Sequence, residues 1–106
     1  MNLLAQLKKG TTVLAVLSAL ERGEGYGYGI RRGAYRKTHG VFAINEGTLY
    51  PLLHALERKG LVRARRQEVK GRERRYYGIT SKGRRELGLA RREWSHLLRS
   101  VEALLR

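Results

Sequence analysis

The sequence predicts a mainly α-helical chain of the α+β class with one small β-hairpin. Two observations carry this prediction. Over most of the chain, apolar residues recur every three or four positions, which is the spacing of buried helical faces. Residues 61–80 differ, because two short β-prone runs there flank the turn sequence KGRE. With 106 residues, the chain has room for one domain with a modest core.

Glycines divide the N-terminal region into two predicted helices. Residues 2–9 are expected to form a short helix that ends at Gly10. Thr11 or Thr12 can cap the next helix, whose apolar residues are core-like and which stops at Gly23.

A third helix is expected within GYGYGIRRGAYRKTHG, residues 25–40, with its stop at Gly40. Its core-like positions at helical spacing are Tyr26, Ile30, Ala34 and Tyr35. Four glycines weaken this helix, since each costs up to about 1 kcal/mol against alanine. Close packing against a neighbouring helix would explain them. The next residues, VFAI at 41–44, form a short apolar run that is β-prone.

The stretch NEGTLYPLLHALERKG, residues 45–60, predicts the best-defined helix. Its leucines at i, i+3, i+4 and i+7 mark one buried face, formed by Leu49, Leu52, Leu53 and Leu56. If Asn45 caps the helix, the missing N–H of Pro51 would have bonded to the carbonyl of Gly47. If Thr48 caps it, the proline lies in the first turn, where no N–H is needed. Both alternatives allow the helix.

Two strands and a long helix complete the chain. The strands are expected at 61–69 and 74–80, around a turn in which Gly71 supplies a permissive backbone. Thr80 is expected to cap a last helix that continues to the C-terminus.

Composition favours nucleic-acid binding over catalysis. The net charge is +14, with 23 Lys and Arg against 9 acidic residues, all of them Glu. Such a charge attracts DNA, RNA or anionic membranes, although the arginine excess equally fits a GC-rich genome. The chain has no Asp or Cys, and its three His residues lack metal-ligand spacing. The glycines of residues 23–29 miss the G-x-G-x-x-G spacing. We therefore expect no enzyme activity, metal or cofactor.

The order helix, helix, short strand, helix, hairpin is that of a winged helix-turn-helix, whose third helix enters the DNA major groove. Here that helix is the one predicted at residues 45–60, and turning its leucines inward leaves its opposite face for DNA. The candidate contacts there are Asn45, Gly47, Thr48, Tyr50, Pro51, His54 and Arg58. The side chains of glycine and proline do not project far from the helix, so that the backbone can approach the groove. The alternative is that these are ordinary solvated helix residues.

The hairpin carries a second set of candidate contacts. Residues 63–75 hold seven basic residues, and Lys70 and Arg72 crown the turn. This arrangement suits a wing tip that contacts phosphates or a narrow minor groove. The alternative is that the charges protect exposed strand edges from aggregation.

Three segments closely resemble the PadR family of bacterial transcriptional regulators, in its short subgroup. They are GYGYGI (25–30), NEGTLYPLLHALERKGLV (45–62) and GRERRYYGITSKGRREL (71–87). The resemblance implies a winged-helix DNA-binding domain at 1–80, with a C-terminal dimerisation helix at 81–106 in one compact unit. It also implies repression at palindromic promoter DNA.

The same resemblance assigns individual residues. It implies that Thr48 and Tyr50 stand on the recognition helix and that Arg72 and Arg74 lie on the wing. The segment after Gly27 has more glycine and arginine than is usual in the family, which adds candidate phosphate contacts at Arg31, Arg32 and Arg36.

The last helix carries an apolar seam typical of a coiled coil. Its members at steps of three and four, with two flanking leucines, are Leu87, Ala90, Trp94, Leu97, Val101, Leu104, Leu98 and Leu105. We expect a homodimer interface here, joined by Leu3, Leu4 and Leu7 of the first helix. Trp94 can anchor the dimer core. Alternatively, since some short PadR members bind planar aromatic ligands between their subunits, Trp94 can stack a small aromatic effector.

Taken together, the residues predict a cytoplasmic, sequence-specific regulator that binds double-stranded DNA as a homodimer. The main alternative is a sequence-independent architectural DNA-binding protein, since +14 gives non-specific binding by itself. An RNA-binding module is disfavoured because few aromatic residues are expected to be exposed. No membrane partner is expected, because the apolar run near the N-terminus is far shorter than the roughly 20 residues of a membrane span.

Overall fold

The computed structural model describes residues 2–106 and contains four helices and three strands within that range. In chain order these are α1 Leu3–Ala19, β1 Gly25–Tyr26, α2 Gly27–Lys37, α3 Glu46–Arg58, β2 Val62–Val69, β3 Arg72–Ile79 and α4 Ser81–Leu105. The strands form one antiparallel sheet in the order β1-β3-β2. The predicted fold class, mainly α with a small β-hairpin, is confirmed.

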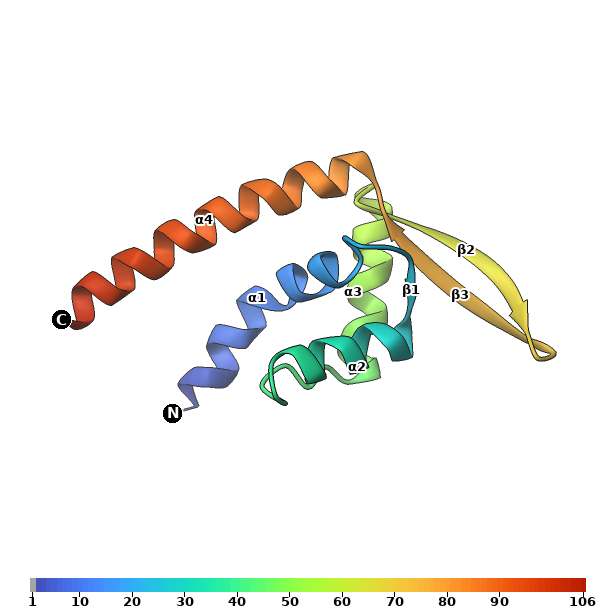
Figure 1. Cartoon of the computed structure of the whole chain (residues 1–106), viewed down its shortest axis with the longest axis horizontal. Coiled ribbons are helices and arrows are strands. Elements are labelled where there is room, and N and C mark those ends of the chain that lie inside the picture. The colour runs from blue at the N-terminus through green and yellow to red at the C-terminus, as the bar shows by residue number, and fades with distance from the viewer. Residues whose placement is uncertain (1) are drawn as a thin grey trace.

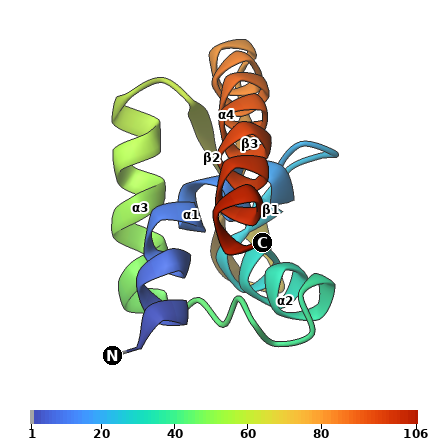
Figure 2. The same ribbon diagram turned by 90° about the vertical axis from the view of Figure 1, so that its left-hand side faces the viewer.

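Helices α1, α2 and α3 form the body of the molecule (Figure 1). The β2–β3 hairpin projects from one end of this body, and α4 runs away from it in roughly the opposite direction. Figure 2 shows α3 and α2 on either side of α1 and α4. The chain is therefore elongated, with extents of 56 × 29 × 21 Å.

One core joins all four helices to the root of the hairpin. Its fully buried side chains include Val16 of α1, Leu20 at the C-cap of that helix, Leu49 and Leu53 of α3, Tyr77 of β3 and Leu87 of α4. The leucine periodicity of α3 thus predicted its buried face correctly, with Leu52 only partly buried at its edge. Burying each large apolar side chain contributes about 1.5–3 kcal/mol.

The prediction of two helices before Gly23 is wrong, because a single helix, α1, continues through Gly10. Thr11 and Thr12 do not cap it. Each hydroxyl donates instead to the Lys8 carbonyl one turn earlier, at 3.1 and 2.9 Å. The cap is Asn2, whose side chain accepts the Ala5 N–H. A lone glycine in a helix costs only about 1 kcal/mol, so it did not interrupt α1.

The β-prone run at 41–44 is not a strand, and it lies in the connection between α2 and α3. Its apolar character comes from packing, since Ile44 is buried and Phe42 packs against the core. The third strand is instead β1, which pairs with Tyr76 and Tyr77 of β3. Tyr35, predicted to be core-like, is 54% exposed.

The predicted hairpin is present, with a tighter turn than expected, because β3 begins two residues earlier, at Arg72. Only Lys70 and Gly71 lie between the strands. Both have positive φ angles, 52° and 76°, as two-residue hairpin turns of this kind require. The predicted cap of the last helix is confirmed, because Thr80 Oγ1 accepts the Gly83 N–H at 3.0 Å. Gly83 lies so close to the Leu61 carbonyl that a Cβ there would overlap its oxygen.

Candidate nucleic-acid interface

Helix α3 presents a continuous exposed face. Gly47, Pro51, His54 and Arg58 are exposed at steps of four, three and four residues, which places them on one side of the helix. Thr48 is exposed beside them. The buried leucines occupy the opposite side. The candidate DNA contacts on α3 are therefore brought together on one surface.

The start of α3 is fixed by its cap. The Thr48 N–H donates to Asn45 Oδ1 at 2.8 Å, which confirms Asn45 as the cap and excludes the alternative start at Thr48. Pro51 thus lies inside the helix, on its exposed face, where the Gly47 carbonyl receives no bond from it. The asparagine oxygen is engaged in capping, so its contribution to any DNA contact would come from its amide NH₂.

Arg31 of α2 positions the start of α3. Its Nε donates to the Ile44 carbonyl at 2.8 Å, and its guanidinium pairs with Glu46 at 3.3 Å. Both partners lie at the entrance to α3. Arg31 therefore ties the connecting loop to α2, and this role differs from the phosphate contact considered for it. Arg32 and Arg36 remain exposed on α2.

Tyr50 is 37% exposed and leans across the first turn of α2. A Cβ added to Gly27 would overlap the Tyr50 hydroxyl and lie 2.7 Å from its Cζ. The glycine therefore makes room for the tyrosine ring. Close packing against a neighbouring helix explains this glycine, whereas Gly33 has no atom within 4 Å of an added Cβ.

The wing tip holds exposed cations. Lys70 and Arg72 are both exposed at the turn of the hairpin, which projects from the same end of the molecule as α3 (Figure 1). Across residues 2–106, the ion-paired arginines are Arg31, Arg65, Arg66, Arg75 and Arg91. The two tip residues do not belong to this set, and their charges are open to solvent.

Arg74 has a different environment from the wing tip. It is half-buried, and its guanidinium lies 4.2 Å from the ring centroid of Tyr26 on β1. A side-chain hydrogen bond with Tyr76 raises the pKa of Arg74. Cation–π contacts of this kind contribute about 0.5–1 kcal/mol at exposed sites. Arg74 therefore braces the wing against β1, which limits its freedom to reach a phosphate.

Further contacts between the hairpin and β1, which the sequence did not predict, support the wing in the same way. Arg65 lies 4.9 Å from the ring centroid of Tyr76 and pairs with Glu24 at 2.8 Å. Hydrogen bonding to Arg65 lowers the pKa of Glu24 despite partial desolvation. Tyr26 packs edge-on against Tyr76, with ring centroids 5.7 Å apart. These contacts hold the hairpin at a fixed angle to the helices.

The candidate dimer residues fall into two groups. Leu87 is only 1% exposed and belongs to the core of the single chain, so its assignment to a dimer surface is wrong. Ala90 is half-buried. The other candidates are exposed, and they are Leu3, Leu4, Leu7, Trp94, Leu97, Leu98, Val101, Leu104 and Leu105. The periodicity of α4 is continuous, but its first turns cover the core and its later turns extend beyond it (Figure 1).

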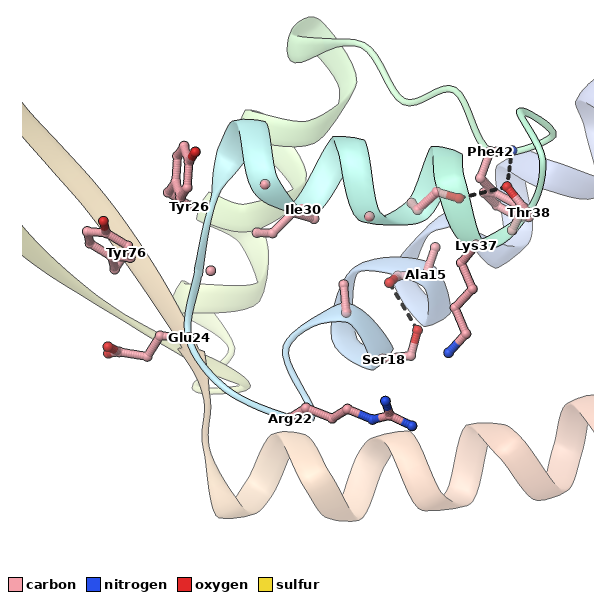
Figure 3. A pocket seen from close by; sticks show the side chains of 15 residues that line it. Ala15, Ser18, Arg22, Glu24, Tyr26, Ile30, Lys37, Thr38, Phe42 and Tyr76 are labelled. Atoms are coloured by element: carbon pink, nitrogen blue, oxygen red, sulfur yellow. Dashed lines mark hydrogen bonds between the residues drawn. The ribbon is translucent and has the colours of Figure 1, made fainter.

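Two of the hollows that flank α1 are wide. An apolar groove of about 630 Å³ lies between α1, α4 and the α2–α3 connection, and its lining includes Leu4, Leu7, Phe42 and Trp94. A second hollow of about 480 Å³ lies between α1, α2 and β1. Figure 3 shows the second one, with Tyr26 and Tyr76 at one end and Lys37 and Phe42 at the other. Neither hollow is lined by the exposed face of α3.

Within residues 2–106, no cluster of three or more His, Asp, Glu or Cys side chains is arranged to hold a metal ion. In the same range, no helix combines the length and apolar character needed to cross a membrane.

Residues 16–89 match the Transcriptional regulator PadR-like family. This match extends from the second half of α1 into α4. The chain belongs to this family.

Relatives and solved structures agree with this assignment. The chain is 44% identical over 63 residues to a Mycobacterium tuberculosis protein named Transcriptional regulator Rv3488, covering 59% of this chain and 58% of that protein. A transcriptional regulator from Clostridium thermocellum has a similar structure, with a TM-score of 0.89, 28% identity and coverage of 95% and 99% of the two chains. A PadR family regulator from Eggerthella lenta gives a TM-score of 0.85 at 35% identity, with coverage of 96% and 88%.

This PadR-family chain is thus a winged-helix transcriptional regulator that acts through DNA, and it is not an enzyme. The long C-terminal helix is part of the fold that it shares with these solved structures.

Proposed function

We propose that this PadR protein is a sequence-specific repressor that binds palindromic promoter DNA as a homodimer. The observation that carries the proposal is the exposed face of α3, with Thr48, His54 and Arg58 beside a projecting basic wing. A major groove about 12 Å wide admits a helix with such a face. In this arrangement, residues 1–80 bind DNA and residues 81–106 form the dimerisation helix.

Helix α3 supplies the proposed sequence readout. The hydroxyl of Thr48, the imidazole of His54 and the guanidinium of Arg58 can donate to base edges or phosphates. No long side chain projects at Gly47 and Pro51, so the start of the helix can approach the groove floor. Tyr50 reaches the same surface with only part of its ring, since the remainder packs over α2.

The wing supplies the proposed phosphate and minor-groove contacts. Lys70 and Arg72 at its tip are exposed, and the brace through Arg74 and Tyr26 fixes the direction in which the hairpin points. A preorganised wing binds DNA at a lower entropic cost than a mobile one. We therefore assign DNA contact to the tip, with Arg74 as its support.

We propose that a second copy of the chain packs against the later turns of α4. Leu97 and Leu98 are about half exposed, and Leu104 is 83% exposed, although all three lie on the apolar seam. Leu4 and Leu7 of α1 extend the same apolar surface. Two symmetric chains would present two α3 helices, and half-sites about 34 Å apart on the DNA would match them.

A planar aromatic effector is the proposed occupant of the groove beside Trp94. That side chain is 39% exposed and lines the groove together with Phe42. Lys8 and Arg91 also line it, which favours a ligand with an anionic group. A ligand there would act on operator affinity by changing how the two subunits sit relative to one another.

Titration of DNA from upstream of the protein's own gene, against a shuffled duplex near physiological salt, tests the proposal. Specific regulators commonly bind their sites about a thousandfold or more tighter than non-specific DNA. We expect a preference of that size and a footprint with two half-sites. Equal affinity for the upstream duplex, the shuffled duplex and duplexes selected for binding from genomic DNA would instead support an architectural protein.

A further inference from the structure

Helix α4 carries a row of arginines that the contacts described above do not use. Arg85, Arg92, Arg99 and Arg106 follow one another at steps of seven residues. Seven residues are close to two helical turns, so Arg85, Arg92 and Arg99 lie in line, about 10.5 Å apart along the helix, and Arg106 follows its last residue. All four are exposed. We call these four residues the arginine row.

The arginine row faces away from the body of the molecule. Leu87 is buried against the core, and the Arg91 guanidinium donates to Glu21 at the end of α1, at 2.7 Å. These two contacts fix the rotation of α4. Arg85, Arg92 and Arg99 each stand two residues before a seam residue, which places them about 160° around the helix from it. A second copy packed on the seam would therefore leave the row exposed.

The charges in the row are not neutralised within the chain. Among residues 2–106, the only α4 arginine in an ion pair is Arg91, which lies outside the row. Glu86 and Glu93 follow row members directly in sequence and so lie about 100° around the helix from them. Glu102 is the one acid within helical pairing distance, three residues after Arg99. The first two members, Arg85 and Arg92, thus carry the least compensated charge.

The start of α4 lies beside the basic end of α3. Lys82, in the first turn of α4, donates from Nζ to the Lys59 carbonyl at 2.9 Å. This contact places the start of α4 beside the last residues of α3, next to Arg58. Arg85, the first member of the row, thus follows three residues after a lysine that contacts the end of the proposed DNA-reading helix.

We propose that the arginine row is a second phosphate-binding surface, which binds duplex DNA outside the operator. Duplex DNA carries one negative charge per about 1.7 Å of its axis, so a row of arginines about 10.5 Å apart faces a dense array of phosphates. Guanidinium groups bind phosphates in a bidentate manner, which suits arginine better than lysine to this task. The DNA bound by the row is either a bent flank of the operator or a separate duplex.

A matched pair of triple variants tests the proposal. The row variant carries Arg85→Gln, Arg92→Gln and Arg99→Gln. The control variant carries Lys9→Gln, Arg22→Gln and Lys37→Gln, three exposed positions outside the row, and has the same net charge. A third variant with lysine at the three row positions keeps the charge. Far-UV circular dichroism and urea unfolding establish that all three are folded.

The readout is the salt dependence of binding to a long duplex that lacks the operator. If each arginine neutralises one phosphate, the row variant loses about 2.7 units of slope per chain in log K against log salt. We expect the control variant to keep the slope of the natural protein and the lysine variant to lose little of it. Equal slopes for the row and control variants would overturn the proposal. A larger loss on duplex RNA than on DNA would overturn it as well, by assigning the row to RNA.

Two further measurements separate this proposal from the proposed function. Operator binding is measured on a duplex just long enough to cover the footprint, and the row variant is expected to retain it. Capture of a labelled duplex by protein on an immobilised one distinguishes a separate duplex from a bent flank. If operator binding itself depended on the row as strongly as long-duplex binding does, the row would be part of the primary interface and the second surface would be refuted.

Discussion

Substitution of Gly27 by alanine is expected to strain the contact between α2 and the recognition helix. The added Cβ would lie 2.7 Å from Tyr50 Cζ and overlap its hydroxyl. Carbon atoms pack best at about 3.5–4.0 Å, so the ring must retreat by roughly 1 Å. Overpacking of this kind costs about 1–3 kcal/mol. Removing a glycine from the first turn offsets part of this cost, by at most about 1 kcal/mol.

The strain can be isolated with a double-mutant cycle. Urea unfolding gives the free energy of unfolding of the natural protein, Gly27→Ala, Tyr50→Ala and the double variant. We expect Gly27→Ala to destabilise the natural protein by about 1–2 kcal/mol and to be neutral or stabilising once the Tyr50 ring is absent. An equal cost in both backgrounds would refute the argument, because the tyrosine would then not be the source of the strain.

Three further predictions concern other elements. Gly83→Ala should destabilise the protein by more than about 2 kcal/mol in urea unfolding, because the Leu61 carbonyl, a backbone group, cannot move aside as a side chain can. Hydrogen bonding to Arg91 lowers the pKa of Glu21 in the folded state, so its stabilisation is full above the ordinary value of 4.5 and is lost as pH falls through the lowered pKa. Urea midpoints between neutral and acidic pH should therefore fall more steeply in the natural protein than in Glu21→Gln. Finally, Lys70→Gln should reduce the salt slope of DNA binding by about 0.9 per chain, and an unchanged slope would show that this side chain contacts no phosphate.

Local signals in the sequence were sufficient for much of the fold. The leucine spacing of α3, the cap at Thr80 and the turn at Gly71 all depend on residues close together in the chain. The choice between Asn45 and Thr48 as the cap of α3 was decided only by the structure. The expectation of a helix break at Gly10 failed because the remaining residues of α1 sustain the helix through one glycine.

Features set by distant contacts were not readable from the sequence. Strand β1 consists of two residues, too few to show any periodicity, and it exists because β3 offers it a free edge. The stacking of Arg74 on Tyr26 follows from that pairing. In the same way, the seam of α4 reads as one continuous stripe, and only the packed structure shows that Leu87 belongs to the core while Leu104 lies outside it.

The central claim, that the exposed face of α3 reads DNA sequence, is tested most directly by Thr48→Ala. This exposed hydroxyl lies in the first turn of α3, the part of a recognition helix that contacts base edges. The measurement is the ratio of affinities for the operator found by the promoter titration and for its shuffled version, with Ser18→Ala of α1 as the exposed-hydroxyl control. We predict that Thr48→Ala lowers this ratio by about 5- to 150-fold, equivalent to about 1–3 kcal/mol, while the affinity for shuffled DNA stays the same. An unchanged ratio, matching that of the control, would contradict the assignment of sequence readout to this face.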